Sequence, residues 1–297
     1  MTILLQADRL RQKIEARTGR PILDLRHFAT GQNANLYLVD LDDERRLMAK
    51  EMRYGEDDDP AGSVTMEAEG WMLEYLARKS KLPVPKVFWY DSSTILMDFI
   101  SGSGVMNNRV QEHAAELVAE LHGIRGDFFG LERDTTTGTS LLPNPYETDW
   151  MVFFRDHRLL HMAQEALKEG ALDTPLMHKI EKLAGKMDEY IDSSVAPGLI
   201  HGDLWGGNVL LGQDRVSAFL DPAMYFADPE IELAAIRLFD TFGDPFFARY
   251  HEIRPARPGF DEVRRHIYGL YPLLVNARHF GRRYAAMVET IIQRFVG

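Results

Sequence analysis

The 297-residue sequence contains no cysteine, which excludes disulfides, thiolate metal sites and a cysteine nucleophile. It also lacks an apolar run long enough to span a bilayer, and its first residues combine a short apolar run with early charges. We therefore expect a cytoplasmic protein with neither a signal peptide nor a membrane partner. The formal net charge of -11 also argues against a nucleic-acid partner bound through phosphates.

The bulk composition is that of an ordinary globular protein. Hydrophobic residues make up 45% of the chain and charged residues 27%, so a sizeable core can form. The length suits one large domain or two smaller ones. A monomer is the default expectation.

The residues with chemical potential concentrate in the stretch 199–222, LIHGDLWGGNVLLGQDRVSAFLDP. His201, Asp203 and Asn208 have the spacing of the kinase catalytic loop, H-x-D-L-x-x-x-N. Two short apolar strands joined by a turn then lead to Asp221, where kinases place a metal-binding aspartate. The stretch therefore matches a kinase catalytic loop and the metal-binding segment that follows it.

This spacing has a chemical reason. Phosphoryl transfer needs a carboxylate to orient or deprotonate an acceptor hydroxyl, beside hard oxygen ligands for magnesium. The alternative is a surface hairpin whose Asp and Asn side chains only cap backbone groups. The complete spacing favours kinase chemistry, with Asp203, Asn208 and Asp221 as catalytic residues and the last two as Mg²⁺ ligands.

The first hundred residues alternate short strands with helices. The pattern predicts a helix over 4–17 and strands over 22–29, 36–41 and 45–53. Gly31, Gln32 and Asn33 lie between the first two strands, where a kinase covers the ATP phosphates, although a plain hairpin turn explains this loop equally well. Lys50 ends the segment LMAK, which has the form of the kinase V-A-I-K lysine; the alternative is a solvated edge lysine.

A helix predicted over 64–78 carries two acidic residues, Glu67 and Glu69. A kinase pairs its strand lysine with a glutamate on this helix, and we expect Glu69 to pair with Lys50. The alternative is that both acids only stabilise the first turn of the helix through its dipole.

The strand predicted over 94–100 ends this half of the chain. Its last residues, Asp98, Phe99 and Ile100, are followed by Ser-Gly, which is typical of a hinge. An extended backbone offers both a donor and an acceptor, so we expect the adenine ring to bind there.

From Val110 onward the sequence is mostly helical. The pattern predicts helices from 110, over 149–167, 174–190 and 228–241, and from 260 to the end, with a loop over 128–145. His113, Glu116, Glu120 and His122 share one helix, but they lack an E-x-x-H pattern and a second matching helix. We therefore expect them to form a solvated face rather than a metal site.

Taken together, these segments resemble the fructosamine kinase (ketosamine-3-kinase) family, relatives of the aminoglycoside phosphotransferases. The resemblance covers most of the chain and is strongest after residue 120. HGDLWGGN and DPAMYFADPEIELA are similar to the catalytic loop and the metal-binding segment of the family. FGLERDTTTGTSLLPNPYETDWMVFFRDHRL resembles a stretch peculiar to the family, and it keeps Gly138, Asn144, Trp150, Phe154, Arg158 and Leu159.

The chain departs from the family pattern at three places. Thr135 and Leu142 stand where the family usually has Asn and Gln, so we expect an acceptor pocket altered at these two positions. The nucleotide loop GQNAN lacks the usual paired glycines. The cysteine often found in that loop is absent, which excludes redox control through it.

The resemblance implies ATP-dependent phosphorylation of the 3-hydroxyl of a sugar attached to an amine, a repair step when the amine belongs to a protein. It implies that Asp203 is the base, that Lys50 binds the α- and β-phosphates, and that Trp205 forms a wall of the acceptor pocket. A core tryptophan is the alternative for Trp205. His201 is expected to hold the loop by hydrogen bonding, and Asp228 and Glu232 to brace it.

The expected fold is therefore α+β and protein-kinase-like, with two lobes. Residues 1–100 form a nucleotide-binding lobe of antiparallel sheet plus helix, and residues 101–297 form a mainly α-helical catalytic and acceptor-binding lobe. The expected ligands are ATP, Mg²⁺ and a free or protein-bound ketosamine. The alternatives are a kinase of the same fold acting on an aminoglycoside, a choline-like compound or another sugar, and a non-catalytic nucleotide-binding pseudokinase.

Overall fold

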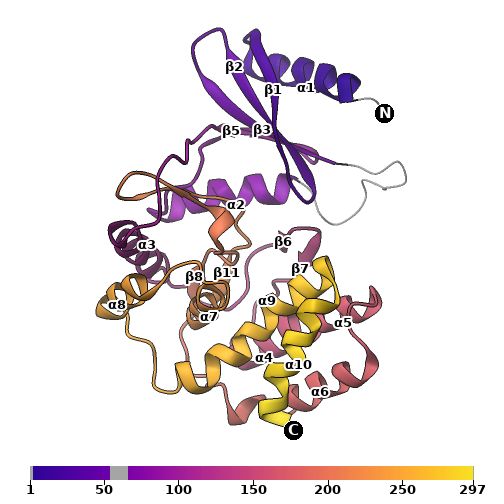
Figure 1. The fold of residues 1–297 in the computed structure, drawn as a ribbon, viewed down its shortest axis with the longest axis vertical. Helices are drawn as coiled ribbons and strands as arrows, with labels where there is room; N and C mark the ends of the chain where they lie inside the picture. Colours follow the sequence, from indigo (N-terminus) through magenta and orange to yellow (C-terminus); the bar gives the residue numbers. More distant parts are fainter. Residues whose placement is uncertain (1–2, 54–65, 297) are drawn as a thin grey trace.

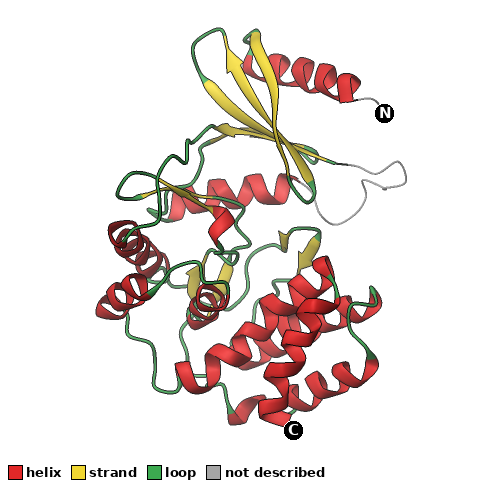
Figure 2. Ribbon diagram, in the orientation of Figure 1, coloured by secondary structure: helices red, strands yellow, loops and turns green. Residues whose placement is uncertain are grey.

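The computed structural model describes residues 3–53 and 66–296. One lobe is built on a sheet of long strands with helices α1 and α2, the other is mainly helical with short strands, and the chain passes between the lobes after β5 (Figure 1, Figure 2). This is the two-lobed α+β architecture that the sequence predicts. The predicted start of a helix at residue 64 lies outside the described residues.

The first lobe is built on a five-stranded antiparallel sheet in the order β1-β2-β3-β5-β4. Its elements are α1 (Ile3–Thr18), β1 (Ile22–Thr30), β2 (Ala34–Leu41), β3 (Arg46–Met52), α2 (Met66–Lys79), β4 (Val87–Tyr90) and β5 (Thr94–Asp98). Each strand predicted from its alternating pattern is present, with ends shifted by one or two residues. The shifts arise because pairing with a neighbour, which the pattern does not record, decides where a strand ends.

Alternation along β3 decides which side chains face the second lobe. Leu47 and Ala49 pack into the core under α1, whereas Met48 packs on the opposite face of the sheet, toward α2. Successive side chains of a strand point to opposite faces, so Lys50 shares the face of Met48. The strand therefore directs its lysine at α2 and the space between the lobes.

Helix α2 contributes to two cores. Met66 and Leu73 pack beneath the sheet, while Met72, Tyr75 and Leu76 belong to the large core of the second lobe. Burial of apolar surface on both sides fixes this helix between the lobes. The proposed boundary at residue 100 therefore divides the chain at a linker but not the hydrophobic packing.

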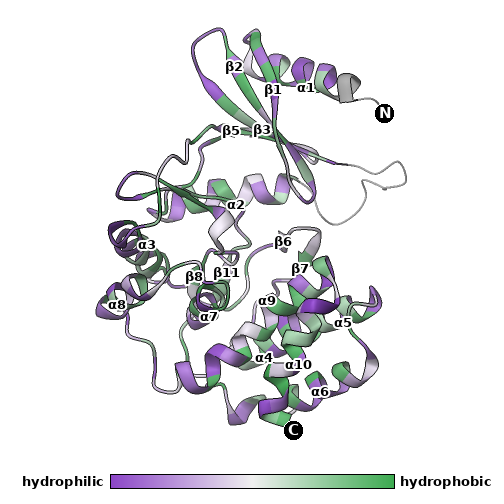
Figure 3. Ribbon diagram, in the orientation of Figure 1, coloured by the Kyte–Doolittle hydropathy of each residue, from purple (hydrophilic) through white to green (hydrophobic). Residues whose placement is uncertain are grey.

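The second lobe is mainly helical (Figure 2). Its helices are α3 (Asn108–Leu121), α4 (Trp150–Phe154), η1 (Arg155–Leu160), α5 (His161–Lys168), α6 (Thr174–Ala184), η2 (Met187–Glu189), η3 (Gly206–Asn208), α7 (Glu230–Leu238), α8 (Asp244–Ile253), η4 (Phe260–Arg264), α9 (Arg265–Phe280) and α10 (Arg282–Val296). Its strands are β6 (Thr135–Thr137), β7 (Ser140–Leu142), β8 (Gly198–Ile200), β9 (Val209–Leu211), β10 (Val216–Phe219) and β11 (Tyr225–Ala227). Most helices carry both hydrophilic and hydrophobic residues, as amphipathic helices around a core do (Figure 3).

Several features of this lobe differ from the sequence prediction, among them the helix α8, which lies where no helix was predicted. The predicted loop over 128–145 contains the β6–β7 hairpin, and β8 pairs with β11 where no strand was expected. The helix predicted over 174–190 is α-helical only as far as Ala184. Strands of three residues are too short to show a pattern of alternation, so only their tertiary partners define them.

No helix within the described residues is both long enough and apolar enough to cross a membrane.

The linker between the lobes is held against the β9–β10 hairpin. The Gly104 amide donates to the Leu211 carbonyl at 2.8 Å. A β-carbon at Gly104 would lie 1.7 Å from the carbonyl oxygen of Gly212, so only glycine allows this approach. Since the same hairpin delivers Asp221, the contact ties the connection between the lobes to the base of the cleft.

Candidate active site

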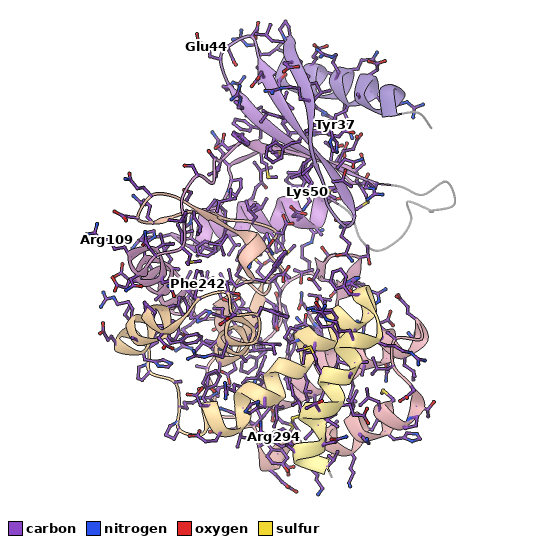
Figure 4. The ribbon with its side chains drawn as sticks, viewed as in Figure 1. Tyr37, Glu44, Lys50, Arg109, Phe242 and Arg294 are labelled. Atoms are coloured by element: carbon purple, nitrogen blue, oxygen red, sulfur yellow. The ribbon has the colours of Figure 1, made fainter. Side chains whose placement is uncertain are left out.

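An ion cluster in the cleft joins three elements through two buried side chains, Lys50 and Glu69, and the half-exposed Asp221. The Lys50 ammonium lies 2.9 and 2.8 Å from the carboxylate oxygens of Glu69 and 2.9 Å from Oδ1 of Asp221. Figure 4 shows Lys50 between the sheet and α2. Glu69 rather than Glu67 makes the pair, as the sequence predicts, because Glu67 points to the surface near Arg133.

The charges of this cluster depend on one another. Burial alone would lower the pKa of Lys50, but the carboxylates of Asp221 and Glu69 outweigh burial and raise it. Burial raises the pKa of Glu69, whereas the ammonium of Lys50 overcomes burial at Asp221 and lowers its pKa. Asp221 also has a φ of 49°, in the left-handed region that few non-glycine residues adopt. Such backbone strain is found preferentially at functional sites.

Asp203 and Asn208 form the second part of the site. The amide nitrogen of Asn208 donates to the backbone oxygen of Asp203 at 2.9 Å and to its Oδ2 at 3.0 Å. Burial, together with the negative charge of Asp221, raises the pKa of Asp203 to about 7. A carboxylate with a pKa near neutrality is suited to accept a proton from a hydroxyl.

The donor set fits a hard divalent cation that arrives with its own oxygen ligands. The nitrogen of the Asn208 amide is used by Asp203, so its oxygen stays available as a ligand, and Asn208 and Asp221 line the same cavity. Across the described residues, no three His, Cys, Asp or Glu side chains are arranged to hold a metal by themselves. Mg²⁺ is usually bound by one or two carboxylates plus substrate phosphates, which matches this sparse set.

The catalytic loop is held from below by Glu232 of α7. Its carboxylate accepts from the amide of Gly202 at 2.6 Å, from the amide of His201 at 3.3 Å and from Nε2 of His122 at 2.9 Å. Glu232 therefore braces the loop, as expected. Asp228 does not, because its carboxylate is bound by Tyr268 and Arg257 instead.

His122 corrects the prediction of a solvated helix face. Its ring is fully buried, with Nδ1 2.7 Å from the Tyr250 hydroxyl and Nε2 on Glu232. His122 ends the apolar side of α3, and its partners lie more than a hundred residues away, so no local pattern separated it from the exposed acids.

We expect Glu232→Gln to lower the free energy of unfolding by about 2 kcal/mol, because one of its buried donors loses a charged acceptor. Turnover is expected to fall as well, since the loop that carries Asp203 loses its support. Denaturant unfolding and steady-state kinetics measure the two effects. Glu116→Gln is the matched control, because Glu116 of α3 is an exposed acid whose partner is Arg249 of α8. Equal stability of the two variants would contradict the bracing role.

The predicted nucleotide loop lines the same cleft. Gly31, Gln32 and Asn33 border the cavity, and the Gly31 amide closes a turn on the Ala34 carbonyl at 2.8 Å. The Asn33 side chain donates to the Gly138 carbonyl of the second lobe at 3.2 Å. The tip of this loop therefore contacts the β6–β7 hairpin across the cleft.

The predicted hinge residues line the same cavity. Asp98, Phe99 and Ile100 all line it, and the amides of the first two are bonded to Lys86 and Arg46. Among the described residues no hydrogen bond uses the Ile100 amide, which leaves a backbone donor for an adenine ring.

Trp205 lies in the cleft and not in the core. It is 49% exposed, and its ring covers Gly207, where a β-carbon would lie 2.2 Å from the ring. The cavity has a volume of about 810 Å³ and contains both Asp203 and Trp205 in its wall. This position favours a binding surface over the alternative of a packed core tryptophan.

Other residues that line the cavity were not found from the sequence. These are Phe28 of β1, Phe280 at the end of α9, and Thr136, Thr137 and Gly138 of the hairpin. The run of threonines before a glycine is a weak strand-and-turn signal that could have indicated the hairpin. For Phe280, no local pattern distinguishes it from other aromatic residues of its helix.

The prediction of an acceptor pocket altered at Thr135 and Leu142 is wrong in its direct form. Both side chains are fully buried, they pair with each other at the base of the hairpin, and neither lines the cavity. Any effect of these two residues on the acceptor must pass through the position of the hairpin.

Comparison with known proteins supports the resemblance to the fructosamine kinase family that the sequence shows. The model of the family described as fructosamine kinase matches residues 11–297. A Synechocystis protein named "Probable ketoamine kinase" is 31% identical over 237 residues, which are 77% of this chain and 77% of that protein. Protein-ribulosamine 3-kinase of Arabidopsis thaliana, a chloroplastic protein, is 29% identical over 245 residues, covering 79% of this chain and 73% of its own length.

Solved structures extend the comparison to the fold. A Thermobifida fusca protein described as a candidate fructosamine-3-kinase has a TM-score of 0.84 at 28% identity, covering 96% of this chain and 97% of its own. The aminoglycoside phosphotransferase APH(4)-Ia has a TM-score of 0.67 at 16% identity over 97% of this chain and 99% of its own. At that identity the second likeness shows the shared kinase-like fold alone.

Proposed function

Since the chain belongs to the fructosamine kinase family, we propose that it transfers the γ-phosphoryl group of ATP to a sugar hydroxyl of a ketosamine. Membership of the family makes it a kinase that uses ATP and a divalent cation. That this cation is Mg²⁺ and that the acceptor is a ketosamine are parts of the proposal. Removal of sugar adducts from amines is the corresponding biological role.

One observation carries the proposal. Lys50, Glu69 and Asp221 meet within 2.9 Å at one cavity, and Asp203 and Asn208 line the same cavity. These side chains come from separate elements of the two lobes. Folding has no stability reason to gather this many charges at one point, because the desolvation of ions such as Lys50 and Glu69 offsets much of their attraction.

The roles follow from the atoms that each residue presents. Asp203 accepts the proton of the acceptor hydroxyl, and the hydrogen bond from Asn208 holds its carboxylate in place. Lys50, oriented by Glu69, donates to the α- and β-phosphates. Asn208 and Asp221 hold the Mg²⁺ ion, which when bound neutralises charge on the transferring phosphoryl group.

Different parts of the cavity wall bind ATP and the acceptor. Asp98, Phe99 and Ile100 offer their backbone to adenine, and Gly31, Gln32 and Asn33 cover the phosphates. Trp205 borders the acceptor, where an aromatic ring packs against the apolar face of a sugar. A cytoplasmic location and a monomeric state stay predictions from the sequence.

The proposal is tested by measuring ADP formation with Mg²⁺ and a panel of acceptors. We expect turnover with ketosamines such as fructosyl-lysine, and none with aminoglycosides, choline or simple sugars. Removal of the cation with EDTA is expected to abolish turnover, because the negative charge of the phosphates then faces the Asp221 carboxylate without a cation between them. Restoration by Mg²⁺ but not by Ca²⁺ would support the small, octahedral ion.

Turnover only with an acceptor outside the ketosamine class would contradict the proposed substrate and retain the kinase chemistry. Nucleotide binding without turnover on any acceptor of the panel would favour the pseudokinase alternative.

A further inference from the structure

Arg158 is a buried cation with neutral partners. It lies in the π-helical turn η1 and is completely buried. Its guanidinium donates to the carbonyls of Pro143 at 2.8 Å and His157 at 2.9 Å, and to the side-chain oxygen of Asn144 at 2.5 Å. In the described parts of the chain no carboxylate pairs with it, and its Nε has no hydrogen-bond partner.

Such an arrangement is costly for the fold. A buried charge is normally paired, because desolvation of an unpaired ion is not repaid by neutral acceptors. Stacking on Tyr225 offsets part of this desolvation free energy, since the guanidinium carbon lies 3.8 Å from the ring centroid. π-helical turns are rare in proteins, and those that occur are often found at functional sites. These features indicate that the position is kept for something other than stability.

The contacts of Arg158 continue to the base of the hairpin. The amide oxygen of Asn144 accepts from Arg158, while its amide nitrogen donates to Oγ1 of Thr135 at 2.8 Å and to the carbonyl of Arg133 at 3.2 Å. Thr135 begins β6 and pairs with Leu142. The residues that follow it, at the tip of the hairpin, line the cavity.

On its other side Arg158 contacts the strand that supports the catalytic loop. Tyr225 lies on β11 and pairs with Ile200, the residue before His201. The carbonyl of His201 also accepts from the Ala223 amide at 2.9 Å. Arg158 therefore lies directly between the hairpin at one wall of the cavity and the strands that position Asp203.

We propose that Arg158 is a positioning residue that fixes the β6–β7 hairpin relative to Asp203, through Asn144 and Thr135, and thereby determines how the acceptor is held. The inference rests on the proposed function, because it places the acceptor at the hairpin end of the cavity. It also gives Thr135, which does not line the cavity, a route to the acceptor through Asn144 and the hairpin.

The first test compares Arg158→Met with Arg155→Met. Both remove an arginine from the same π-turn, but Arg155 is partly exposed and pairs with Asp156. A shift of the hairpin by about 1 Å is expected to lower kcat/KM for the ketosamine by about 100-fold in Arg158→Met. The KM for ATP is expected to change much less, because the nucleotide loop is hydrogen-bonded to the hairpin only through Asn33 and Gly138 in the described residues. Arg155→Met is expected to match the wild type in both parameters.

The second test uses a pair of variants that preserve the shape of the site. Thr135→Val removes the hydroxyl that Asn144 binds, and Thr135→Ser retains it. We expect Thr135→Val to raise the KM for the acceptor about tenfold, because one buried hydrogen bond is lost. Thr135→Ser keeps the hydroxyl and is expected to have the KM of the wild type. This pair tests the proposal even where Arg158→Met does not fold.

Hydrogen–deuterium exchange of the hairpin amides gives a readout that needs no acceptor. Faster exchange over 135–142 in Arg158→Met and Thr135→Val, but not in Arg155→Met or Thr135→Ser, supports the inference. Unchanged exchange, or an equal rise in the KM values of acceptor and ATP, overturns it. If the wild-type protein phosphorylates no ketosamine, the proposed function fails by that result, and exchange alone then decides the positioning role.

Discussion

Replacing Asp203 with asparagine is expected to lower kcat by about 1,000-fold, the contribution of a positioned general base. The nucleotide Kd is expected to stay unchanged, because Asp203 is proposed to act on the acceptor hydroxyl and not on ATP. An asparagine keeps the size of the side chain and can still accept the hydrogen bond from Asn208, which lies 3.0 Å away. Steady-state kinetics with a ketosamine and titration with a fluorescent nucleotide measure the two quantities.

The fold is expected to tolerate this change. Burial disfavours the charged form of Asp203, which is why its pKa is raised to about 7, and a neutral amide avoids that cost. The melting temperature of Asp203→Asn should therefore equal or exceed that of the wild type. Asp214→Asn is the matched control, an exposed acid in the β9–β10 turn. Turnover near the wild-type rate in Asp203→Asn would refute the assigned base.

Replacing Lys50 with methionine is expected to remove both activity and stability. Its ammonium makes three contacts of 2.8–2.9 Å with Glu69 and Asp221, and of these groups Lys50 and Glu69 are buried. Breaking the buried Lys50–Glu69 pair by removing the lysine costs about 3 kcal/mol, because the Glu69 carboxylate stays buried without a cation. Loss of the phosphate donor is expected to lower kcat/KM for ATP by at least about 100-fold.

A double variant separates these two effects. Lys50→Met with Glu69→Gln removes one of the stranded carboxylates, so part of the stability should return while activity stays lost. Lys86→Met serves as the control, since Lys86 is an exposed lysine of the same lobe. Denaturant unfolding measures the stability term. A Lys50→Met protein with wild-type kcat/KM for ATP would exclude the assigned role of the lysine.

The sequence alone was sufficient where chemistry and local pattern coincide. Asp203 and Asn208 precede the β9–β10 hairpin and Asp221 follows it, so the spacing along the chain already limits their spacing in the fold. Lys50 was found for a similar reason, because alternation along a single strand decides which face its side chain takes. The antiparallel strands of the first lobe and the long amphipathic helices of the second follow from the same local periodicities.

Only the tertiary structure decided which distant residues meet. The sequence assigned His122 to a solvated face, but α7 and α8 bring Glu232 and Tyr250 to its two ring nitrogens. It also placed Thr135 in the acceptor pocket, whereas pairing with Leu142 buries it at the base of a hairpin held by Arg158 and Asn144. These contacts arise from the packing of elements separated by many residues, and no local pattern records that packing. The sequence thus determined which polar side chains meet in the cleft, and the tertiary structure decided the walls around them.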